Sequence, residues 1–131
     1  MDKNIEDSSF DFAVRIVRMF KHLQKEKSEY ILSKQVLRSG TSIGANVREA
    51  QFGQSKRDFL AKMSIALKEA HETAYWIELL KATEYLVPEH ADSILADCIA
   101  IRSVLTAIVK TTRENLEAEI SEESTDPRPI Y

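Results

Sequence analysis

Residues 29–52 read EYILSKQVLRSGTSIGANVREAQF, and this stretch decides the fold. Its apolar and small residues at positions 32, 36, 40, 43, 47 and 50 are spaced 4, 4, 3, 4 and 3. That spacing keeps one face of an α-helix in phase across Ser39-Gly40-Thr41, whereas a loop would normally reset the phase. The spacing therefore predicts one continuous helix over residues 29–52, and a loop at residues 39–42 is the alternative.

Gly40 and Gly44 lie on the same face of this predicted helix, four residues apart. Each glycine inside a helix costs about 1 kcal/mol relative to alanine. Small residues at this spacing let a second helix approach closely. We therefore expect Gly40 and Gly44 to be sites of close helix packing.

Periodic apolar residues and capping residues indicate three further helices. Ser8 or Ser9 can cap the first, Ser55 can cap the third, and Pro88 suits the first turn of the fourth. The four predicted helices cover about residues 9–26, 29–52, 56–85 and 88–117.

The two ends of the chain lack this periodicity. Residues 1–8 form a short polar segment, and residues 118–131 are acidic with two prolines, which predicts a disordered tail. Residues 9–117 then hold four helices joined by short connections. Such connections favour an all-α, antiparallel, up-down-up-down four-helix bundle.

The composition of the 131-residue chain agrees with a single helical domain. Hydrophobic residues make up 44%, enough for a core, while three Gly and three Pro are too few for an all-β fold. The single cysteine, Cys98, excludes a disulfide scaffold and a cysteine zinc site. The polar start of the chain and the lack of a long apolar run predict a cytoplasmic protein without a membrane span.

The predicted first helix is apolar around most of its circumference. Between Phe10 and Phe20 only Asp11, Arg15 and Arg18 are polar, and they form one narrow stripe. A surface helix usually has an apolar arc only somewhat wider than 100°, so the excess needs a cover. The composition thus predicts an oligomer, with an interface formed by Phe10, Phe12, Ile16, Met19 and Phe20.

Motifs for catalysis, metal binding and cofactor binding are incomplete. The segment HETAY at residues 71–75 begins like the H-E-x-x-H metalloprotease signature but ends in Tyr75. Cys98 lies in an apolar seam without the electropositive setting that a nucleophile needs. No phosphate-binding glycine loop is present, so we expect no enzyme activity, no catalytic residue, no metal and no cofactor.

The helix 2–3 region resembles a known family. Residues 38–50, RSGTSIGANVREA, are followed by Gly53, Ser55 and the segment KRDF at 56–59. This pattern resembles the four helix bundle protein family, first noticed in intervening sequences of bacterial 23S rRNA genes, over roughly residues 10–110. The family commonly has Pro where this chain has Gly44.

Members of that family are similar to the accessory variability determinant of diversity-generating retroelements. That accessory protein is a homopentameric, basic, barrel-like bundle that binds nucleic acid and a reverse transcriptase. The resemblance thus implies a bacterial homopentamer whose partners are RNA or DNA, bound without sequence specificity, and a reverse transcriptase or another protein. It implies no small-molecule substrate.

The charge pattern locates the surface on which such binding would depend. Residues 15–68 carry twelve Lys or Arg against four acids, although the whole chain has a net charge of -3. A strongly basic segment can attract phosphate groups. The candidate nucleic-acid contacts are Lys34, Arg38, Arg48, Lys56, Arg57 and Lys62. The alternative is a structural or protein-binding scaffold in which these charges pair with acids and keep the protein soluble.

Overall fold

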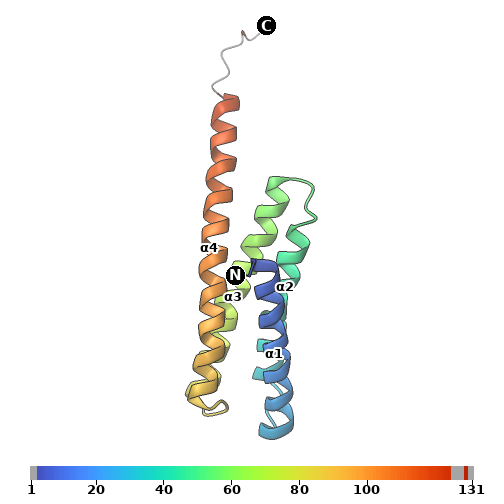
Figure 1. Ribbon diagram of the computed structural model, residues 1–131, viewed down its shortest axis with the longest axis vertical. Helices are drawn as coiled ribbons and strands as arrows, with labels where there is room; N and C mark the ends of the chain where they lie inside the picture. Colours follow the sequence, from blue (N-terminus) through green and yellow to red (C-terminus); the bar gives the residue numbers. More distant parts are fainter. Residues whose placement is uncertain (1–2, 125–128, 130–131) are drawn as a thin grey trace.

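Four helices form an antiparallel, up-down-up-down bundle, as predicted (Figure 1). The computed structural model describes residues 3–124 and 129 of the chain. The helices are α1 (Ile5–Lys27), α2 (Leu32–Ala50), α3 (Lys56–Ala82) and α4 (Pro88–Ser124). Within the described residues there is no strand, which confirms the all-α class. None of these four helices is both long and apolar enough to cross a membrane.

Helix α2 runs without interruption through Gly40, as its apolar spacing predicted. The glycine lies directly against α1, because a Cβ atom at position 40 would come within 2.7 Å of Ile16 Cγ1. At Gly44 the same atom would lie 3.2 Å from the backbone oxygen of Ser9. The two glycines thus remove the side chains that would otherwise keep α1 and α2 apart.

Helix α1 begins earlier than predicted. The side chain of Asn4, rather than that of Ser8 or Ser9, caps it by accepting a hydrogen bond from the Asp7 N–H at 2.8 Å. Residues 5–8 are therefore helical, and the predicted helix start at about residue 9, after a separate polar segment 1–8, is wrong for them. Residues 1 and 2 lie outside the described chain. Ser9 is buried against α2 instead of serving as a cap.

Helix α2 begins three residues later than predicted because Glu29 is a capping residue. Its carboxylate accepts hydrogen bonds from the N–H groups of Ile31, Leu32 and Ser33, at 3.1, 2.9 and 2.6 Å. These are orphan donors of a helix N-terminus, which need acceptors when they are buried. Glu29 itself is buried, with 8% of its surface exposed.

The ends of α3 and α4 also differ from the prediction. Helix α3 stops at Ala82 rather than 85, and Glu84 adopts a left-handed backbone conformation with φ 67°. Helix α4 continues to Ser124, so the predicted disordered tail is wrong for residues 118–124. An ion pair between Lys56 and Glu119 joins this extension to the start of α3. The rest of the predicted tail, apart from residue 129, lies outside the described chain.

The core is mostly apolar and contains a buried pair of hydroxyl groups between α2 and α3. Thr73 on α3 and Ser39 on α2 join their hydroxyl groups at 2.9 Å, and both residues are fully buried. The pair links α2 to α3 inside the core, and the Thr73 hydroxyl also lies 2.7 Å from the Glu69 carbonyl oxygen of its own helix. The buried apolar residues of α1 and α2 are Phe12, Ile16, Met19, Leu23, Val36, Ile43, Val47 and Ala50.

The bundle is closed unevenly around its circumference. Helices α1, α2, α3 and α4 pack extensively in sequence, but α1 and α4 share far fewer contacts. Figure 1 shows α4 continuing well past the start of α1. A groove therefore remains between α1 and α4. Beside the first half of α1 its volume is about 630 Å³.

Candidate interaction surfaces

Helix α1 carries two parallel apolar stripes, one residue apart. The first, Ser9, Phe12, Ile16, Met19 and Leu23, is buried inside the chain. The second, which we name the outer stripe, has the same spacing and is partly or mostly exposed. It consists of Phe10, Ala13, Val17 and Phe20.

The buried stripe corrects the predicted oligomer interface. Phe12, Ile16 and Met19 are 2%, 0% and 9% exposed, so they belong to the core of one chain. Ile16 is buried directly against Gly40 of α2, whereas Phe12 and Met19 lie on the side of α1 that faces α4. Phe10 and Phe20 are different: Phe10 is 53% exposed and Phe20 is partly exposed. Only these two of the five predicted residues remain available to a partner.

The outer stripe borders a shallow hollow of about 110 Å³ between α1 and α2. Phe10 and Ala13 line it from α1, and Thr41 and Ala45 line it from α2. At its edge the Arg48 guanidinium carbon lies 5.6 Å from the centre of the Phe10 ring. The result is a mostly apolar strip with a charged border, which resembles the core and rim of a protein interface.

Most of the predicted basic contacts are already paired with acids of the same chain. Arg38 on α2 pairs with Glu69 and Glu72 of α3, and Glu72 also accepts a hydrogen bond from the Trp76 indole at 3.1 Å. Arg48 pairs with Glu6 of α1 at 3.5 Å. These pairs link neighbouring helices, which is the structural role that the sequence left open.

At the start of α3, too, acids of the same chain pair with most of the predicted basic residues. Lys56 pairs with Glu119 of α4, and Lys62 pairs with Glu49 of α2 at 2.9 Å. Within the described part of the chain, Lys34 and Arg57 have no acidic partner. The structure therefore does not gather the six predicted residues into one unpaired basic patch.

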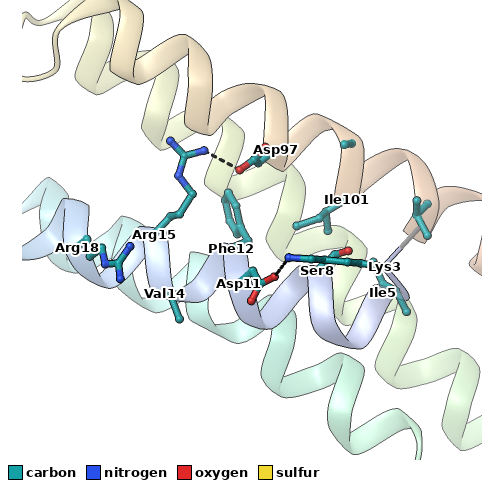
Figure 2. Close-up of a pocket in the computed structure, with 12 residues that line it drawn as sticks. Lys3, Ile5, Ser8, Asp11, Phe12, Val14, Arg15, Arg18, Asp97 and Ile101 are labelled. Carbon is teal, nitrogen blue, oxygen red and sulfur yellow. Dashed lines mark hydrogen bonds and ion pairs between the residues drawn. The ribbon is translucent and has the colours of Figure 1, made fainter. Parts of the chain in front are cut away.

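The groove between α1 and α4 is a surface that the sequence did not reveal. Figure 2 shows Arg15 reaching across it from α1 to Asp97 on α4, with Nη1 and Oδ2 2.6 Å apart. Near the start of α1, Lys3 pairs with Asp11. Apolar side chains, including Phe12 and Ile101, line the groove beside these pairs. The polar stripe of Asp11, Arg15 and Arg18 on α1 lines this groove and is the sequence feature that could have indicated it.

The residues considered for catalysis do not form a site. Burial raises the pKa of the Cys98 thiol to about 11, and its sulfur lies 3.4 Å from the Ala70 carbonyl oxygen. Such a thiol remains protonated and unreactive near neutral pH. His71 is exposed on α3. Among the described residues no three His, Cys, Asp or Glu side chains cluster as metal ligands would.

Comparison with known proteins agrees with the motif in α2 and α3. No curated protein sequence matches the chain significantly. A crystal structure from Bacteroides thetaiotaomicron, described as a protein of unknown function from the S23 ribosomal protein family, is 53% identical. The match covers 82% of this chain and 99% of that one, with a TM-score of 0.81. The family model of the 23S rRNA-intervening sequence protein matches residues 1–107. The chain therefore belongs to the 23S rRNA-intervening sequence protein family.

Proposed function

We propose that the protein is a non-enzymatic helical scaffold that assembles into a cyclic homo-oligomer through the outer stripe of α1. The single observation that carries this proposal is the outer stripe of α1. Phe10 is 53% exposed and Ala13, Val17 and Phe20 are partly exposed, although the core of the chain is complete. The large members of the stripe are Phe10, Val17 and Phe20. Contiguous apolar surface of this kind on a soluble protein commonly marks a contact with another protein.

A second copy of the chain is the proposed occupant of this surface. Burying each large apolar side chain fully contributes roughly 1.5–3 kcal/mol. In a ring every subunit uses two interfaces, so contributions of this size accumulate against the entropic cost of association. Closure of a head-to-tail contact into a ring also prevents open-ended filaments. The resemblance to the retroelement accessory protein supports five subunits.

Nucleic-acid binding is the second candidate function. The exposure of two basic side chains, Lys34 and Arg57, favours it. Both are exposed and have no acidic partner among the described residues. The pairing of the other four basic residues with acids favours the scaffold. A reverse transcriptase or another protein partner would bind to the assembled ring rather than to a single subunit.

A Phe10→Glu, Val17→Glu double variant is expected to dissociate the assembly into subunits of about 15 kDa, one chain of 14.9 kDa. Two carboxylates on the outer stripe would have to leave water in the assembly, and only the one at position 10 has a cation, Arg48, beside it, so the change is strongly unfavourable. The fold of one chain should survive, because Phe10 is exposed and Val17 is partly exposed. Sedimentation velocity measures the mass, and circular dichroism checks the helical content.

The matched control is a Phe52→Glu, Ile65→Glu double variant. It introduces the same charge at apolar positions that are 79% and 42% exposed and lie outside the outer stripe. This control should keep the mass of the wild type. If the control dissociates while the outer-stripe variant stays assembled, the stripe is not the interface and the proposal is wrong in its central feature.

A further inference from the structure

The groove between α1 and α4 continues into a second, smaller pocket near the start of α4. It has a volume of about 260 Å³ and lies between the second half of α1 and the start of α4. Arg15 and Arg18 belong to both parts of the groove. The residues that line the pocket are Arg15, Arg18, Met19, His22, Leu86, Val87, His90 and Ile94.

The polar part of this lining consists only of Arg and His side chains. Two arginines and two of the three histidines of the chain meet here, and no Asp or Glu lines the pocket. Arg15 is held in place, because it pairs with Asp97 at 2.6 Å and donates to Ser93 Oγ at 3.0 Å. Arg18 has no ion-pair or hydrogen-bond partner in the described part of the chain. The pocket thus has one fixed cation and one free cation, with two histidines beside them.

The start of α4 adds backbone donors to the same pocket. The first helical hydrogen bond runs from the Ala91 N–H to the Val87 carbonyl at 2.9 Å. The N–H groups of Glu89 and His90 have no acceptor among the described residues, and Pro88 has no N–H to offer. Free N–H groups at a helix N-terminus, together with the helix dipole, attract anions. Val87 and His90, which flank these N–H groups in the chain, both line the pocket.

The remaining lining is apolar. Met19, Leu86 and Ile94 are 9%, 7% and 4% exposed, so they form a largely buried apolar side of the pocket. Arg18, the two histidines and the two backbone N–H groups offer more donors than the about four lone pairs of a carboxylate can accept, whereas the phosphate of a monoester offers three oxygens and up to two negative charges. We infer that this pocket binds a small phosphate monoester, with the phosphate between Arg18 and the histidines and an apolar group against Met19, Leu86 and Ile94.

Phenyl phosphate is a suitable probe, with inorganic phosphate and phenol as its two halves. In an NMR titration of ¹⁵N-labelled protein, phenyl phosphate should shift amide signals concentrated in residues 15–22 and 86–94. It should bind more tightly than either half, because only the whole molecule uses both the cationic and the apolar lining. Shifts spread over all basic residues, or no saturable shift with phenyl phosphate, would overturn the inference.

An Arg18→Gln, His90→Gln variant tests the residues directly. Loss of charge-assisted hydrogen bonds should weaken phenyl phosphate binding by about tenfold or more. An Arg113→Gln, His71→Gln variant removes the same residue types from exposed positions outside the pocket and should bind as the wild type does. Equal weakening in both variants would contradict a specific site. The sedimentation mass of both variants should be unchanged, so this inference can fail independently of the proposed assembly.

Discussion

The Gly40→Ala substitution is expected to destabilise the protein, although alanine is the better helix former by about 1 kcal/mol. The added Cβ atom would lie 2.7 Å from Ile16 Cγ1, and Ile16 is fully buried. Forcing extra volume into a packed core costs about 1–3 kcal/mol. Urea unfolding at a fixed protein concentration measures the change.

A double-mutant cycle identifies Ile16 as the cause. Ile16→Ala alone should cost about 2–5 kcal/mol because it leaves a cavity. The Gly40→Ala, Ile16→Ala variant should lose about 1–2 kcal/mol less than the sum of the single losses, since the new methyl group occupies space that the isoleucine leaves. Ala61→Gly, at an exposed position of α3 outside the outer stripe and the groove, measures the intrinsic difference between the two residues. If the losses in unfolding free energy are additive, Ile16 of α1 does not pack against Gly40, and the account of this contact is wrong.

The second large effect is expected from Glu29→Gln, which should lower the free energy of unfolding by about 2 kcal/mol at pH 7. The variant keeps one acceptor but loses the charge that receives three backbone N–H groups at the start of α2. Glu26→Gln, an exposed position near the end of α1, is the matched control and should change stability little. A Glu29→Gln protein as stable as this control would contradict the capping role.

The effect of Glu29 should depend on pH. Burial raises the pKa of its carboxyl, but the hydrogen bonds from Leu32, Ser33 and Ile31 outweigh burial and hold the pKa below its ordinary 4.5. A lowered pKa in the folded state stabilises the protein fully above pH 4.5 and less as the pH falls through the lowered value. The stability gap between wild type and Glu29→Gln should therefore narrow below about pH 4.5. Unfolding free energies measured from pH 7 to pH 3 test this, and a constant gap would contradict it.

The sequence predicted the number and direction of the helices well, because their apolar periods are long. The continuity of α2 through Gly40 could be read from spacing alone, since a helix keeps its phase across a glycine. The helix ends were less accurate. Asn4 replaced Ser8 or Ser9 as the cap, and Glu29 caps α2 from outside the helix. Several residues near each end can serve as caps, and tertiary packing chooses between them.

The candidate surfaces were only partly predictable, for two physical reasons. Two stripes on α1 with identical spacing, one through Phe12 and one through Phe10, are equally apolar in sequence. The positions of α2 and α4 around α1 decide which is buried. The pairing of Arg38 with Glu69 and Glu72 joins residues more than 30 positions apart, as does the Arg15–Asp97 pair. A charge pattern along the chain gives the charges of segments but not which acid lies opposite which base.

The mass of the wild-type protein in solution tests the proposed assembly most directly. Multi-angle light scattering at micromolar concentration is expected to give about 75 kDa, five times the 14.9 kDa of one chain. The proposed assembly predicts a mass above that of one chain, because it covers the partly exposed outer stripe of α1, and the resemblance to the retroelement accessory protein predicts five subunits. A mass of 14.9 kDa under these conditions would mean that the outer stripe remains in water, and it would contradict the proposed scaffold.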